Sequence, residues 1–157
     1  MRILKILAVA ASGLVLALGA SACGGDDDED EDTAAVEEAG AETVNVTATE
    51  YSFDLSATPT AETQEITLEN LGQEEHDLIF ARINEGYTLQ DAIEAEGEQG
   101  TAEQFRPVLF AKPGEEAKQA IQLDGLEPGH YAMVCTVETK DGQPHFDLGM
   151  TTEFDVE

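Results

Sequence analysis

Hydrophobic and polar residues alternate along much of the chain from Thr43 onward. Val44, Val46 and Ala48 alternate with polar residues, and a second run from Tyr51 to Leu55 repeats the pattern. A period of two is typical of strands that bury one face and expose the other. Further candidate strands are Glu65 to Glu69, His76 to Ile83, Gln119 to Leu123, His130 to Val137 and Thr152 to Val156.

Turn-forming residues separate these runs, and about seven short strands divided in this way favour an all-β sandwich. The turn signals are Pro59, Asn70-Leu71-Gly72, Lys112-Pro113-Gly114, Asp124-Gly125, Pro128-Gly129 and Asp141-Gly142. One segment, Thr88 to Glu96, has helical spacing instead, and Thr88 with Asp91 forms a capping box. We therefore expect a short helix inserted in a long connection between strands.

The first 22 residues are typical of an export signal. Arg2 and Lys5 precede an apolar run from Ile6 to Leu18, and small residues then lead to Cys23. A cysteine in this place resembles the lipobox of bacterial lipoproteins, in which it receives lipid. The alternative is cleavage of Ala20-Ser21-Ala22 by an ordinary signal peptidase. We expect residues 1–22 to be the signal, 23–42 a lipidated and acidic tether, and 43–157 the folded domain.

The chain is strongly acidic. It carries 34 Asp and Glu against 7 Lys and Arg, a formal net charge of −27, and loss of Arg2 and Lys5 with the leader leaves −29. Such a surface repels nucleic acid and anionic lipid headgroups. The run from Asp26 to Asp32 has too little apolar surface to fold, which suits a spacer. These features predict a domain on the outer face of the cell membrane, attached only through lipid on Cys23.

Cys135 is the only thiol in the predicted domain, which is unusual for an exported protein. It could be buried and inert, it could pair with Cys23, or a metal could hold it. Its spacing places it on the same strand face as Tyr131 and Met133, with the sulfur toward the core. After the Asp141-Gly142 turn, the chain returns with His145 and Met150.

A second histidine, His76, opens a strand that follows the Asn70-Leu71-Gly72 turn. Two imidazoles with a thiolate and a thioether form the ligand set that suits copper. Each residue also has an ordinary interpretation: His76 as a polar strand start, His145 as an exposed loop residue, and Met150 as a core filler.

Three stretches of the chain resemble the cupredoxins, the blue-copper family: His76-Asp77-Leu78, Leu126 to Tyr131 leading into Cys135, and His145 with Gly149-Met150. The resemblance covers about Val44 to Val156 and is closest to the cupredoxin-domain lipoproteins of actinobacteria. It implies a Greek-key β-sandwich with one type 1 copper ion, held by His76, Cys135, His145 and Met150.

Two features depart from the family pattern. Nine residues, Thr136 to Pro144, separate Cys135 from His145, which is longer than usual. Asp77 stands where the family often has Asn, and an ionised Asp accepts hydrogen bonds but cannot donate them. The third histidine, His130, is predicted to lie at the surface or in a turn, and Tyr131 to be a packing residue.

These features together predict a protein that carries electrons and is not an enzyme, since no second copper centre, phosphate-binding glycine loop or Ser-His-Asp arrangement is evident. The alternatives are copper delivery with the same ligands, or a metal-free interaction module. The acidic surface predicts a redox partner with a basic docking patch. We expect the chain to be a monomer.

Overall fold

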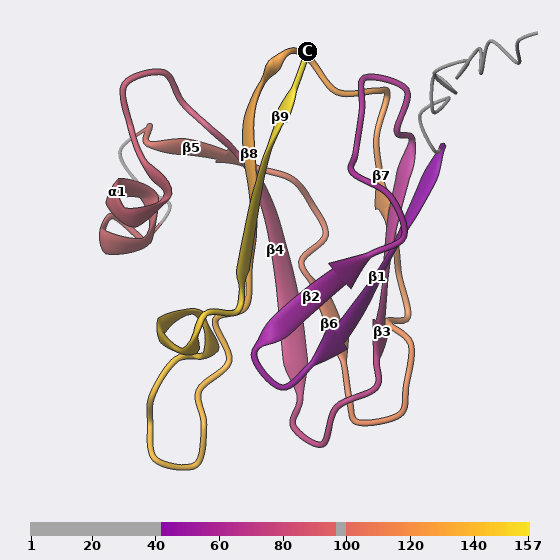
Figure 1. Ribbon diagram of the computed structural model, residues 1–157, viewed down its shortest axis with the longest axis vertical. Coiled ribbons are helices and arrows are strands. Elements are labelled where there is room, and N and C mark those ends of the chain that lie inside the picture. Colours follow the sequence, from indigo (N-terminus) through magenta and orange to yellow (C-terminus); the bar gives the residue numbers. More distant parts are fainter. Residues whose placement is uncertain (1–41, 97–99) are drawn as a thin grey trace, which may run out of the picture. The chain divides into compact units, whose positions relative to one another are not determined.

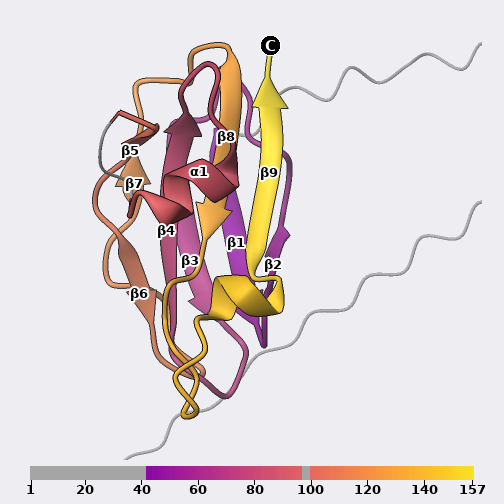
Figure 2. The same ribbon diagram turned by 90° about the vertical axis from the view of Figure 1, so that its left-hand side faces the viewer.

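Two β-sheets pack face to face in the computed structural model, which describes residues 42–96 and 100–157 (Figures 1 and 2). The expected signal segment, Cys23 with its expected lipid, and all of the expected tether before Glu42 lie outside the described residues. Within the described ranges, no helix is long and apolar enough to cross a membrane.

The first sheet has the strand order β2-β1-β3-β7, and the second has the order β5-β4-β8-β9, with β6 also paired to β4. Strands β1 and β3 are parallel and the other pairs are antiparallel. The bounds are β1 Thr43–Thr49, β2 Ser52–Leu55, β3 Glu65–Asn70, β4 His76–Ile83, β5 Ala102–Gln104, β6 Leu109–Ala111, β7 Ile121–Gln122, β8 Gly129–Val134 and β9 Thr151–Val156. The expected β-sandwich with one short inserted helix is confirmed.

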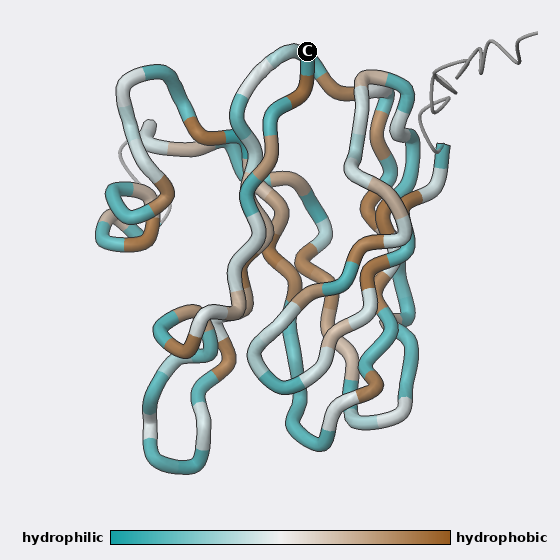
Figure 3. Tube along the Cα trace, viewed as in Figure 1, coloured by the Kyte–Doolittle hydropathy of each residue, from teal (hydrophilic) through white to brown (hydrophobic). Residues whose placement is uncertain are grey.

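The alternation along the strands produces the core between the sheets. In β1, Val44, Val46 and Ala48 are at most 1% exposed, as the pattern predicted. Hydrophobic stretches follow the strands, whereas the connections at the lower end of Figure 3 are largely hydrophilic. Tyr131 is also buried and stacks with Phe80, Phe105 and Phe154, which confirms it as a packing residue.

The helix α1, Leu89–Glu94, begins with the predicted capping box between Thr88 and Asp91. It lies over the outer face of the second sheet (Figure 2), where Ala92 packs with Ile83, Ala132 and Val134. This second, smaller core covers the face of β4 and β8 that points away from the first sheet.

Several boundaries differ from the sequence-based expectations. β8 ends at Val134 rather than Val137, because Cys135 and the residues after it leave the ladder to form the site described below. β7 is two residues long, since it pairs with β3 only at Ile66 and Glu65. β5 and β6 were not predicted, because three residues are too few to show a period.

Three connections meet at one end of the sandwich: the β1–β2 turn, the segment from β3 to β4, and the chain between β8 and β9 (Figures 1 and 2). They carry most of the predicted ligands and their neighbours.

Candidate metal centre

His76, Cys135 and His145 come together at this end of the sandwich, and all three side chains are 0% exposed. The Nδ1 atoms of the two histidines are 3.1 Å apart. Cys135 Sγ lies 3.8 Å from His76 Nδ1 and 3.4 Å from His145 Nδ1. The ordinary interpretation of His145 as an exposed loop residue is therefore wrong. His76 does open β4, but its side chain is buried in the cluster.

The spacing of the three atoms fits a single transition-metal ion. Atoms separated by 3.1, 3.4 and 3.8 Å share a centre that lies about 2.0 Å from each of them. In zinc sites, metal bonds are about 2.0–2.1 Å long to imidazole nitrogen and about 2.3 Å to thiolate sulfur. Because both histidines direct Nδ1 inward, the proton of each neutral ring belongs on Nε2.

Cys135 follows the last residue of β8, and its face is the one predicted from Tyr131 and Met133, since all three lie in the main core. Its backbone nitrogen donates to the Met150 carbonyl over 3.1 Å, and the Met150 nitrogen donates to the His145 carbonyl over 3.1 Å. Met150 is 0% exposed in the same core. The backbone of Met150 is thus tied to both neighbouring ligands.

His145 begins a turn of 3₁₀ helix, His145–Leu148, that the sequence did not predict. The long connection before it is an ordered hairpin: the His145 nitrogen donates to the Val137 carbonyl over 2.8 Å, and Thr139 bonds to Gln143 over 2.9 Å. The Phe146 nitrogen donates to the Cys135 carbonyl over 3.0 Å. His145 is therefore positioned by hydrogen bonds at the base of the hairpin.

Asp77 braces the residue after the cysteine through its carboxylate, which accepts hydrogen bonds, while its backbone N–H donates to Cys135. It is 4% exposed, and its carboxylate accepts from the backbone nitrogen and from the hydroxyl of Thr136, each over 2.6 Å. Since both partners donate, an ionised Asp fits the position.

Burial determines the protonation of the cluster before a metal binds. It raises the pKa of the Cys135 thiol to about 12. It also lowers the pKa of His76, an effect to which the nearby His145 adds. At neutral pH the metal-free site therefore holds a thiol and a neutral His76 imidazole.

The connection from β3 to β4 was predicted only as a turn, yet it is built around the site. The buried Asn70 side chain donates to the Glu74 carbonyl over 2.7 Å and accepts from the Gly72 nitrogen over 2.8 Å. The Glu50 carboxylate accepts from the backbone nitrogens of Gln73 and Glu74. A Cβ at Gly72 would lie 2.6 Å from Glu50 Oε1 and 3.1 Å from His76 Nε2, so glycine gives the room for this close approach.

His130 does not belong to this cluster. It is the second residue of β8 rather than part of a turn, and its side chain is 40% exposed, so the surface prediction is confirmed. Its ring bonds to Glu153 and Asp155, each over 2.8 Å, and these contacts raise its pKa.

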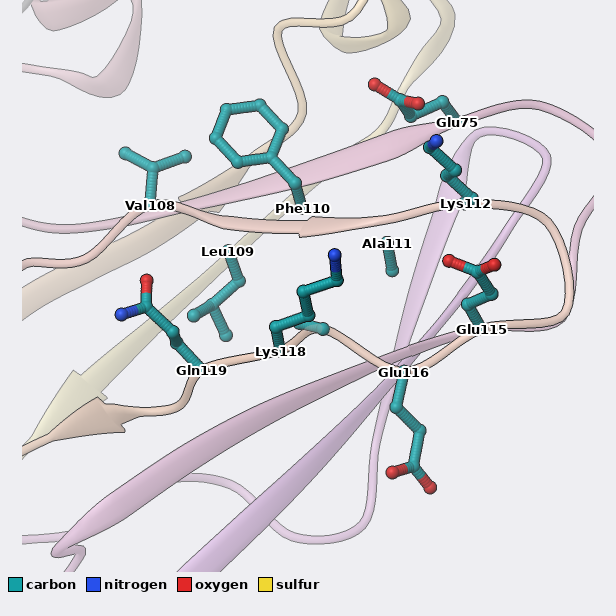
Figure 4. A pocket seen from close by; sticks show the side chains of 11 residues that line it. Glu75, Val108, Leu109, Phe110, Ala111, Lys112, Glu115, Glu116, Lys118 and Gln119 are labelled. Carbon is teal, nitrogen blue, oxygen red and sulfur yellow. The ribbon is translucent and has the colours of Figure 1, made fainter.

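A groove of about 440 Å³ runs beside β6 (Figure 4). Its lining includes Phe110, Lys112, Lys118 and Glu75, and Figure 4 shows Glu75 at the same end as Lys112. None of the four predicted ligands lines it. The groove is thus separate from the metal centre.

No family model and no curated protein sequence matches the chain. Several solved structures do match the chain. Dithionite-reduced auracyanin from Roseiflexus castenholzii is 19% identical, with a TM-score of 0.49 over 75% of this chain and 98% of that one. Auracyanin B is 19% identical, with a TM-score of 0.41 over 78% and 93%. Auracyanin A from Chloroflexus aurantiacus, described as a "blue" copper protein, is 16% identical, with a TM-score of 0.45 over 73% and 98%.

Proposed function

We propose that this chain is a cupredoxin that carries electrons through one type 1 copper ion held by His76, Cys135 and His145, with Met150 as the weak axial ligand. The observation that carries the proposal is the convergence of two Nδ1 atoms and one Sγ around a common centre, with every side chain buried. Two imidazoles and a thiolate, with Met150 hydrogen-bonded through its backbone to Cys135 and His145, form the donor set of a blue-copper site, which favours copper over zinc.

A bound copper ion would supply one-electron chemistry by alternating between Cu(II) and Cu(I). The chain's contribution is to keep the ligands in one arrangement in both states. The hydrogen bonds among Cys135, His145, Met150 and Phe146, together with the brace from Asp77, fix the backbone on both sides of the thiolate. A site that barely moves needs little reorganisation when an electron arrives or leaves.

Burial of the ligands distinguishes electron transfer from catalysis and from copper delivery. A substrate needs access to an open ligand position, and a delivered ion needs a way out, whereas an electron needs neither. Because His76, Cys135, His145 and Met150 are each 0% exposed, electron transfer fits the site better than catalysis or copper delivery.

The test is copper loading of the domain. Cu(II) bound to the wild type should give intense thiolate-to-copper absorption in the visible range, and Cys135→Ser should abolish it. A colourless Cu(II) complex of the folded wild type would exclude the proposed site. Voltammetry then distinguishes the carrier from a delivery protein: a fast, reversible couple supports the carrier, whereas tight Cu(I) binding with slow electron exchange supports delivery.

The partner in this proposal is a redox protein with a basic patch, attracted by the net charge of −29 that remains once Arg2 and Lys5 leave with the leader. Small oxidants provide a test. The rate with cationic tris(phenanthroline)cobalt(III) should fall as salt shortens the screening length toward about 8 Å, and the rate with anionic hexacyanoferrate(III) should rise. Equal salt dependence for both ions would remove the electrostatic argument.

Attachment to the outer face of the membrane through lipid on Cys23 belongs to the same proposal and is supported by the leader sequence. Mass spectrometry of the membrane fraction tests it.

A further inference from the structure

Both outer nitrogens of the histidine pair, His76 Nε2 and His145 Nε2, are buried without an aligned hydrogen-bond partner among the described residues. For His145, however, a carboxylate is close: Glu74 Oε2 lies 3.2 Å from Nε2. The distance is that of an ion pair, while the direction is off the axis of a good hydrogen bond. The Glu74 side chain is partly exposed, so its carboxylate has room to turn into line with the Nε2–H group.

The position of Glu74 is built by its surroundings. Asn70 holds its carbonyl and Glu50 holds its nitrogen, so the backbone is fixed on both sides of the Cα atom. The Tyr51 hydroxyl donates to Glu74 Oε2 over 3.4 Å. The Glu74 side chain is 29% exposed while His145 is 0% exposed, so the carboxylate lies between the imidazole and solvent.

Tyr51 covers the same imidazole. Its ring meets His145 edge-on, with centroids 5.1 Å apart and planes at 72°. Tyr51 has a φ of 63°, in the left-handed region that a bulky side chain rarely adopts. This backbone conformation favours glycine and costs free energy for a tyrosine. Its presence at position 51 therefore indicates that the Tyr51 side chain has a role there.

We propose that Glu74 is a positioning residue for His145: its carboxylate, held by Tyr51, accepts a hydrogen bond from the Nε2–H group and so directs Nδ1 at the metal. The inference rests on the proposed copper function. A histidine ligand that donates its outer N–H to a carboxylate is fixed in orientation and becomes a stronger donor. A stronger donor favours Cu(II) over Cu(I), so Glu74 lowers the reduction potential of the site.

The experiment compares Glu74→Ala, Glu74→Gln and Tyr51→Phe with a matched control, Glu75→Ala. Glu75 carries the same charge one residue away, but its side chain lines the groove beside β6 (Figure 4). Glu74→Ala should weaken Cu(II) binding about 10- to 100-fold, the usual cost of losing such a partner. If Cu(I) binding is unchanged, each tenfold loss raises the potential by about 59 mV. Glu74→Gln, which keeps an acceptor oxygen, should restore part of the affinity, and Tyr51→Phe should have a smaller effect.

A second readout needs no redox chemistry. In the protein loaded with Zn²⁺, the His145 Nε2 proton should be visible by NMR in the wild type and in Glu75→Ala, and should exchange with solvent at least tenfold faster in Glu74→Ala. Equal shifts of the potential in Glu74→Ala and Glu75→Ala, with unchanged proton exchange, would overturn the inference. If the wild type shows no thiolate-to-copper band while the zinc readout depends on Glu74, the proposed function fails and the positioning role stands. If Glu74→Ala does not fold, Glu74→Gln and Tyr51→Phe still give both readouts.

Discussion

Copper uptake is expected to expel one proton from the Cys135 thiol, and this proton makes the affinity depend on pH. Burial raises the thiol pKa to about 12, so the metal-free site is protonated at every pH at which the protein would normally be studied. The ligand form of cysteine is the thiolate. The metal must therefore displace a proton, and this cost is part of the measured binding free energy.

The size of the cost follows from the distance between the working pH and the pKa. At pH 8 the gap to a pKa of about 12 is four units, which at 1.36 kcal/mol per unit is about 5 kcal/mol. Zinc-finger peptides bind Zn²⁺ with apparent free energies of about 10–16 kcal/mol at pH 7 even after their thiols release protons, so a proton cost of this size is compatible with binding. Each unit of pH below the pKa should change the affinity about tenfold, with tighter binding at higher pH.

Calorimetry tests this directly. Titration of Cu(II) into the metal-free domain at pH 8, in two buffers with different ionisation enthalpies, should report the release of one proton per copper ion. The affinity should rise about 100-fold between pH 7 and pH 9. Cys135→Ser should bind more weakly and release no proton. If the wild type releases no proton and its affinity is flat across this range, copper is held without the thiolate and the proposed site is wrong.

Two further changes test the surroundings of the cluster. The raised thiol pKa stabilises the metal-free fold below pH 9, and this stability is lost as the pH rises toward 12. Up to about 4 kcal/mol of unfolding free energy should therefore disappear over that range. Urea unfolding at several pH values should show a shallower decline of the unfolding free energy in Cys135→Ala than in the wild type, and an equal decline would contradict the burial argument. Gly72→Ala places a Cβ against Glu50 and His76, and should cost about 1–3 kcal/mol of stability and weaken copper binding. Leu71→Ala, at a side chain that is 61% exposed, should do neither. Thermal unfolding and copper titration of the two variants check this.

The sequence predicted the parts of the site that depend on local pattern. The period of two placed Cys135 on the core face with Tyr131 and Met133, and the apolar run after His76 predicted a buried strand. The hairpin returning through Asp141-Gly142 correctly brought His145 back toward the cysteine, and Gly142 has the left-handed conformation of a turn, with a φ of 80°.

The remaining parts depend on contacts between distant segments, for which a single sequence has no local signal. Glu74 looked like one of several acidic residues before His76, and Tyr51 looked like a strand residue because it alternates with Phe53 and Leu55. Only the pairing of β1 with β3, and the approach of His145 from 71 residues further along than Glu74, brings these side chains together. The glycine at position 72 was noted as a turn signal, but its closeness to Glu50 and His76 follows from the same long-range packing.

The long connection between Cys135 and His145 shows how an unusual spacing can leave the ligands in place. The bond from the His145 nitrogen to the Val137 carbonyl closes the base of the hairpin, and the bridge between Glu138 and Pro144 lies just beyond it. Everything past that bridge, Thr139 to Gln143, is a separate turn. The ligand spacing is therefore set by the base, and the tip adds length without adding freedom at the metal.

This division can be tested by shortening the tip. Replacing Thr139–Gln143 with Asn-Gly leaves Glu138 and Pro144 as the pair that flanks a two-residue turn, a connection that suits paired strands. We expect the shortened protein to keep the thiolate-to-copper band and to bind Cu(II) within about threefold of the wild type. A threefold change corresponds to a difference of about 0.65 kcal/mol in binding free energy. A change at the base, Val137→Pro, restrains the backbone beside the carbonyl and also removes the Val137 N–H that hydrogen-bonds to Cys135, so it should weaken binding more. If instead the shortened tip abolishes the band while the domain still unfolds cooperatively, the residues of the tip help to hold His145 and the base alone is insufficient.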